Sequence, residues 1–97
     1  MEERDAYVEK REAEIKELQA ELDRVKALAE KAKAEAKLKY QTEARKLGEK
    51  LEEARSRLNE IGEAAGDVWL EMRSSFDESV KAIRGSLDAA KKQISDS

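Results

Sequence analysis

The stretch that decides the fold covers residues 15–61 and reads IKELQAELDRVKALAEKAKAEAKLKYQTEARKLGEKLEEARSRLNEI. Apolar residues return in it every three or four positions, which places them along one stripe of an α-helix. Glu, Lys, Arg and Gln fill most of the positions between, and no proline interrupts the pattern. The stretch therefore predicts a long amphipathic helix whose stripe must be covered by another helix.

The spacing of the stripe changes near its middle. From Ile15 to Ala32 the apolar positions are four and three residues apart in alternation, which is the repeat of a left-handed coiled coil. From Ala32 to Ala44 three steps of four follow one another, and such a stutter locally unwinds the supercoil. We interpret it as a local change within one continuous helix over residues 2–61.

The next interruption is Gly62-Glu-Ala-Ala-Gly66, followed by Asp67. Glycine is common just past the end of a helix, and Asp is a good cap for a following one. A loop over residues 62–66 and a second helix over residues 67–94 fit this pattern. The alternative is one continuous helix that uses the small residues for close packing.

Both expected helices carry a large apolar face, and together these faces form the interaction stripe that we predict. Its members are Ile15, Leu18, Leu22, Val25, Leu47, Leu51, Leu58, Ile61, Trp69, Met72, Phe76, Val80, Ile83 and Leu87.

The expected lengths of the two helices differ. At a rise of 1.5 Å per residue the first would be about 90 Å long and the second about 40 Å, so a hairpin cannot cover its own stripe. Residues 1–30 carry a net charge of −4 and residues 31–60 a net charge of +3, which favours antiparallel pairing with a second copy. We therefore expect a single all-α domain over residues 1–97, a helical hairpin or coiled coil that forms a homo-oligomeric bundle. An antiparallel dimer is favoured, with trimers and tetramers open, and another helical protein is the alternative partner.

The amino-acid composition argues against catalysis, metal binding and disulfide formation. The 97 residues include no Cys and no His, which excludes disulfides and removes the commonest metal ligand and proton-transfer group. Carboxylate clusters such as Glu14, Glu17 and Glu21 lack the His partners of di-iron bundles, so a solvated helix face is the simpler interpretation. We expect no catalytic residue, cofactor or metal, and hence no enzyme.

The sequence favours neither a membrane-spanning segment nor a nucleic-acid partner. No run approaches the roughly 20 apolar residues that span a bilayer, and the acidic N-terminus is not a signal peptide, so we expect a cytoplasmic protein. Nucleic acid is disfavoured by a net charge of −3, despite a basic run. That run consists of Lys31, Lys33, Lys37, Lys39, Arg45 and Lys46. An amphipathic second helix could instead lie on a lipid surface, although it lacks the basic excess that anionic membranes favour.

Three segments carry a resemblance to a known family. They are Ala6-Tyr-Val-Glu-Lys10, the Lys/Ala tract from Ala27 to Tyr40, and Ala65-Gly-Asp-Val-Trp-Leu-Glu-Met-Arg73. In this order they resemble the small bacterial coiled-coil stress-response proteins, whose biochemical activity is not established. Members often carry a second Trp eleven residues after the first, where this chain has Val80. The resemblance implies a stress-associated helical protein and transfers no catalytic residue.

The expected function is therefore that of a non-enzymatic, self-associating protein with a structural or protein-protein interaction role. The alternative is a peripheral lipid-binding protein that acts through the helix at 68–94.

Overall fold

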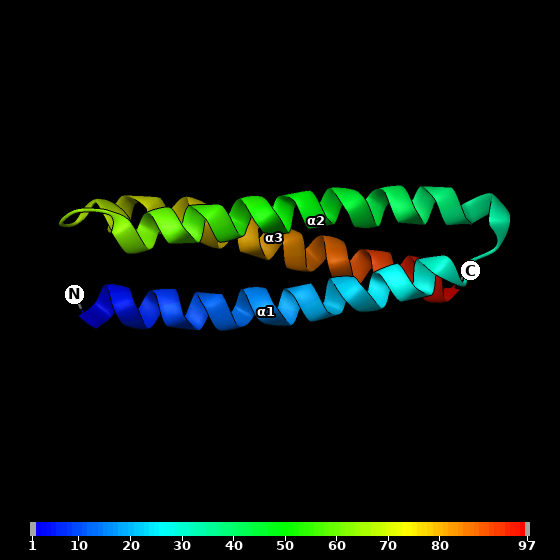
Figure 1. Cartoon of the computed structure of the whole chain (residues 1–97), viewed down its shortest axis with the longest axis horizontal. Helices are drawn as coiled ribbons and strands as arrows, with labels where there is room; N and C mark the ends of the chain where they lie inside the picture. The colour runs from blue at the N-terminus through cyan, green and yellow to red at the C-terminus, as the bar shows by residue number, and fades with distance from the viewer. Residues whose placement is uncertain (1, 97) are drawn as a thin grey trace.

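The computed structural model describes residues 2–96 and places them in three helices joined by short turns, with no strand among them (Figure 1). Helix α1 covers Glu2–Glu30, α2 covers Ala34–Glu63 and α3 covers Val68–Asp96. Consecutive helices run in opposite directions, so α1 and α3 are parallel and α2 is antiparallel to both. Each helix packs against the other two, and the Cα atoms span 51 × 16 × 15 Å.

The expected continuous helix over residues 2–61 is wrong, because a turn at residues 31–33 divides it into α1 and α2. The end of α1 tightens into hydrogen bonds of the i to i−3 type, in which the Lys31 and Ala32 amides donate to the Leu28 and Ala29 carbonyl oxygens. Lys33 then adopts an extended backbone with φ −61° and ψ 148°, which redirects the chain into α2. The expected two-helix hairpin is thus a three-helix bundle.

The second turn lies close to its predicted position. Helix α2 ends at Glu63 and α3 begins at Val68, so a turn over residues 64–67 replaces the loop expected at 62–66, and the continuous-helix alternative is wrong. Gly66 has a φ of +56°, in the left-handed region that glycine enters without the steric penalty of a Cβ atom. The Arg4 side chain of α1 donates a hydrogen bond to the Ala64 carbonyl oxygen, which ties this turn to the start of the chain.

A single aliphatic core runs along the axis of the bundle. Because the three helices have nearly equal lengths of 29, 30 and 29 residues, each apolar stripe is covered over its full length by the other two. The buried members of the core are Ile15, Leu18, Leu22, Val25, Ala29, Tyr40, Ala44, Leu47, Leu51, Ala54, Leu58, Ile61, Trp69, Phe76, Val80, Ile83, Leu87, Ala90 and Ile94.

Candidate interaction surfaces

The predicted interaction stripe lies inside the bundle. Thirteen of its fourteen residues are buried, and Met72 is half-buried against the same core. The stripe is therefore covered without a second chain, since the turn at residues 31–33 folds α2 and α3 back onto α1. Any surface that binds a partner must be sought among the exposed residues.

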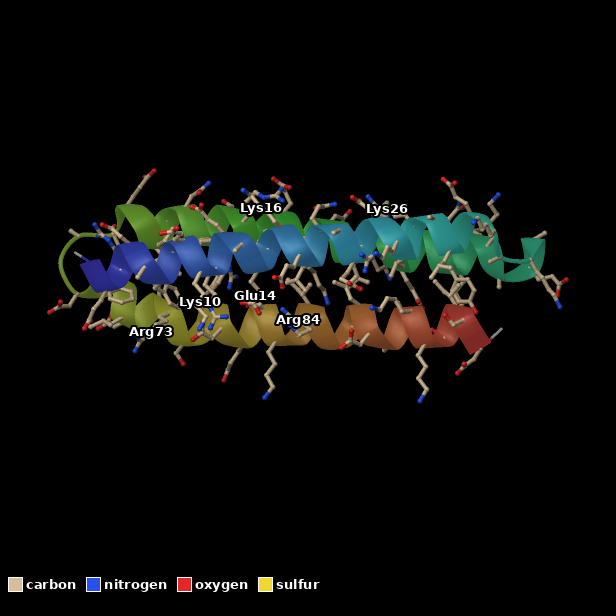
Figure 2. All side chains as sticks on the ribbon, turned by 90° about the horizontal axis from the view of Figure 1, so that it is seen from below. Lys10, Glu14, Lys16, Lys26, Arg73 and Arg84 are labelled. Atoms are coloured by element: carbon tan, nitrogen blue, oxygen red, sulfur yellow. The ribbon has the colours of Figure 1, made fainter. Side chains whose placement is uncertain are left out.

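The contact between α1 and α3 is bordered by charged side chains. Arg11 Nη2 lies 3.0 Å from Asp77 Oδ1, and Arg84 Nη2 lies 2.9 Å from Glu14 Oε2. Glu21 pairs with Lys91 one step further along the bundle. Figure 2 shows Glu14 and Arg84 between the two helices. Because α1 and α3 are not joined directly by a turn, these pairs help to set their parallel register.

Glu14 is held in its ionised form by this arrangement. Partial burial favours the protonated carboxyl, but hydrogen bonds from Arg84 and Arg11 outweigh it, and the pKa of Glu14 is lowered. A carboxylate stabilised in this way contributes to the free energy of unfolding at neutral pH. Glu14 therefore stabilises the contact between α1 and α3.

Tyr7 anchors the same contact near the N-terminal end of the bundle. Its ring centroid lies 5.8 Å from that of Trp69 and 6.4 Å from that of Phe76, at distances typical of aromatic pairs. Its hydroxyl donates a hydrogen bond to Asp77. Burial, together with this hydrogen bond, raises the pKa of Tyr7 to about 12, so the phenol stays neutral and structural.

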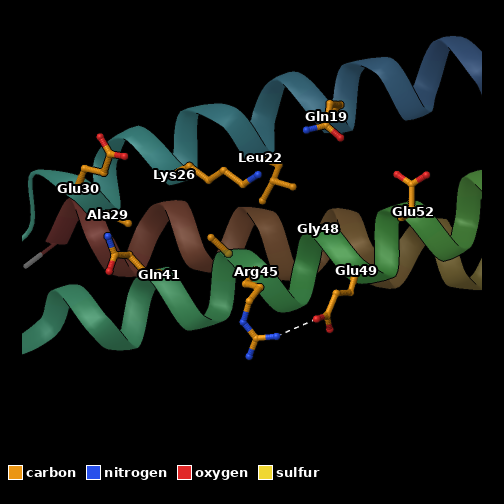
Figure 3. Close-up of a pocket in the computed structure, with 11 residues that line it drawn as sticks. Gln19, Leu22, Lys26, Ala29, Glu30, Gln41, Arg45, Gly48, Glu49 and Glu52 are labelled. Carbon is orange, nitrogen blue, oxygen red and sulfur yellow. Dashed lines mark hydrogen bonds and ion pairs between the residues drawn. The ribbon is translucent and has the colours of Figure 1, made fainter.

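An open groove of about 590 Å³ separates α1 from α2 (Figure 3). Its lining includes the small residues Ala29, Ala44 and Gly48 beside Leu22. Charged and amide side chains border it, and Arg45 Nη1 bonds Glu49 Oε1 at 2.7 Å along its rim.

The described residues do not offer a metal centre or a membrane-spanning element. Among residues 2–96, no three His, Cys, Asp or Glu side chains are grouped so that they could hold a metal ion. Over the same residues, the helices are too polar for any of them to cross a bilayer.

Among residues 2–96, three large apolar side chains are exposed, and they lie at the two ends of the rod. Leu38, with 74% of its surface exposed, follows the turn between α1 and α2. Val68 and Leu70, 51% and 39% exposed, follow the turn between α2 and α3 at the opposite end. Leu38 is not among the interaction residues predicted from the sequence, although its position off the apolar stripe and between two lysines was a usable signal.

These two ends differ in charge. Residues 31–39 contain four Lys and one Glu, and we call this region with Leu38 the basic end. Residues 60–71 contain Glu60, Glu63, Asp67 and Glu71 with no Lys or Arg, and we call this region with Val68 and Leu70 the acidic end. Arg45 and Lys46, which end the basic run noted in the sequence, lie further along α2, and Arg45 is paired with Glu49.

No protein-family model, no curated protein and no solved structure matches this chain, so the resemblance to the stress-response proteins stays an expectation from the sequence.

Proposed function

We propose that this protein is a non-enzymatic helical module of the cytoplasm, which acts by association with copies of itself in the stress response that its resemblance implies. One observation carries the proposal: the large apolar side chains that the bundle leaves exposed are gathered at its two ends. Isolated exposed apolar residues are common on monomeric proteins, so exposure alone would carry little weight. Their restriction to the ends is what favours association.

The proposed association differs from that expected of a single long helix. Because the apolar core is covered within one chain, we expect the chain to fold without a partner. Association then joins bundles that are already folded, through contacts at their surface. Helicity should therefore be independent of protein concentration, while the mean mass should rise with it.

Sedimentation equilibrium combined with circular dichroism over a concentration series tests this proposal. We expect the mean mass to rise above the 11.0 kDa of one chain at constant helicity. Replacement of Leu38, Val68 and Leu70 by Gln should reduce the rise without loss of helix. A mass that stays at one chain at every concentration would refute self-association.

The lipid-surface alternative is favoured by Val68 and Leu70, which are exposed on either side of Trp69 at the start of α3. Two features reduce its support: the broad apolar face of α3 is buried in the core, and the acidic end would be repelled by anionic lipid. Flotation with neutral and with anionic vesicles tests it, and binding that requires α3 would be weakened by Val68→Gln with Leu70→Gln.

A further inference from the structure

We propose that copies of this protein associate head to tail, with the basic end of one bundle against the acidic end of the next. This inference rests on the proposed self-association and names the surfaces that would carry it. It accounts together for all three large apolar residues that are exposed in residues 2–96.

The apolar contribution comes from both ends. Leu38 stands at the basic end and Val68 and Leu70 stand at the acidic end, so a head-to-tail contact would bring an apolar residue of one copy to two of the next. Burial of apolar surface is favourable in proportion to the area removed from water. The contact would therefore have a small apolar centre within a charged rim, as protein interfaces commonly do.

The charges decide the orientation of the contact. Residues 31–39 have a net charge of +3 and residues 60–71 a net charge of −4. At the acidic end the first turns of α1 add Glu3 and Asp5 against Arg4, and Arg73, which lies over the Trp69 ring, offsets the difference. At the basic end Glu30, which ends α1, and Asp96 stand against Lys92, so this end stays positive and the other stays negative. Like ends would repel each other, so symmetric end-to-end dimers are disfavoured. A contact between two different surfaces does not close on itself and leads to open chains of copies.

The size of the bundle limits the strength of this contact. Its Cα cross-section of 16 × 15 Å is well below the roughly 800 Å² per partner that stable interfaces bury. We therefore expect reversible association that is visible only in concentrated samples. Because exposed charges carry much of it, the association should weaken as the Debye length shortens from about 30 Å at 0.01 M salt to about 3 Å at 1 M.

An anionic lipid surface is the strongest competing occupant of the basic end. Four lysines around an exposed Leu38 would suit it. That occupant leaves Val68 and Leu70 at the acidic end unexplained, whereas a second copy uses both ends. A second copy is therefore the occupant that the two ends together favour, and vesicle flotation distinguishes it from a lipid surface.

Charge reversal at each end provides the test, because the residues concerned are exposed and the helices do not depend on them for their packing. The basic-end variant carries Lys31→Glu, Lys33→Glu and Lys39→Glu. The acidic-end variant carries Glu60→Lys, Glu63→Lys and Glu71→Lys. A control variant reverses three exposed lysines in the middle of the rod, Lys46→Glu, Lys50→Glu and Lys81→Glu, and has the same net charge as the basic-end variant. Circular dichroism confirms that each variant is folded.

Sedimentation at low salt then measures association. Each end variant alone should associate at least about tenfold more weakly than the wild type, since it sets like charges against each other. An equimolar mixture of the two variants should associate again, and a chain with all six reversals should behave as the wild type. The control variant should keep more association than the basic-end variant at equal net charge.

Other outcomes would overturn the proposal in distinguishable ways. If the wild type associates and the end variants do so equally well, self-association stands and the head-to-tail arrangement falls. If the wild type does not associate, the proposed function falls with it. If the wild type instead co-floats with phosphatidylserine vesicles and the basic-end variant does not, the basic end binds a lipid surface. If the mixture of variants fails to recover, the two ends are not each other's partners.

Discussion

The substitution Leu22→Ala tests whether the apolar stripe is covered within one chain. Leu22 is only 1% exposed, and its Cδ2 atom would lie 3.5 Å from a Cβ atom added at Gly48. Leu→Ala at buried sites costs about 2–5 kcal/mol, and since Leu22 borders the open groove between α1 and α2, we expect a loss of about 2–3 kcal/mol. Leu38→Ala is the matched control, because the same atoms are removed from a side chain that is 74% exposed, where surface substitutions change stability by about 0.5 kcal/mol or less.

Urea unfolding followed by circular dichroism measures both variants, at two protein concentrations a hundredfold apart and at high salt. If folding required a second chain, hundredfold dilution would lower the free energy of unfolding by about 2.8 kcal/mol, since each tenfold corresponds to about 1.4 kcal/mol. We expect no such shift. A midpoint that moves with concentration, or a Leu22→Ala variant no less stable than Leu38→Ala, would refute coverage within one chain.

Three further predictions concern the turn and the contact between α1 and α3. Gly66→Ala should destabilise the protein by about 1–2 kcal/mol, as measured by urea unfolding, because φ is +56° at this residue. Gly85→Ala, at a helical site with open space around the added Cβ atom, should instead stabilise the protein by about 0.5–1 kcal/mol. A change of stability in the same direction for both variants would contradict this prediction. The pKa of Tyr7 is raised from 10.0 to about 12 in the folded state, so its contribution is present below pH 10 and is lost as pH rises towards 12. In thermal melts the Tyr7→Phe variant should therefore lose less stability between pH 10 and pH 12 than the wild type does. An equal loss of stability in the two proteins would contradict this role of Tyr7. The pKa of Glu14 is lowered in the folded state, so its contribution is present above its unfolded pKa near 4.5 and is lost as pH falls through the lower folded value. Glu14→Gln should therefore be less stable than wild type at pH 7 and should lose less stability on acidification, as acid titrations of the unfolding midpoint would show.

Much of the local structure could be read from the sequence. The return of apolar residues every three or four positions identified the helical class and thirteen buried members of the core. The pair Gly62 and Gly66 indicated a turn, and Gly66 does adopt the left-handed backbone that favours glycine. These features are local, so they depend on side-chain spacing and backbone sterics that a single stretch of chain already contains.

The turn at residues 31–33 could not be predicted in the same way. Lys31, Ala32 and Lys33 include neither Gly nor Pro, and Ala and Lys are good helix formers. The stutter from Ala32 to Ala44 was a signal at this place, but a continuous unwound coil and a chain reversal are equally compatible with it. The error at this one turn also produced the expectation that a second chain must cover the stripe.

Sequence by itself therefore determined that the chain is helical, which residues avoid water, and where glycine permits a reversal. Tertiary structure alone decided that the long apolar stripe breaks at residues 31–33 and that its two halves cover each other together with α3. The physical reason is that a turn of three residues sacrifices few helical hydrogen bonds, whereas folding back removes three apolar stripes from water at once. That gain in free energy depends on contacts between residues far apart in the chain, and the helix propensity of a short segment contains no information about such contacts.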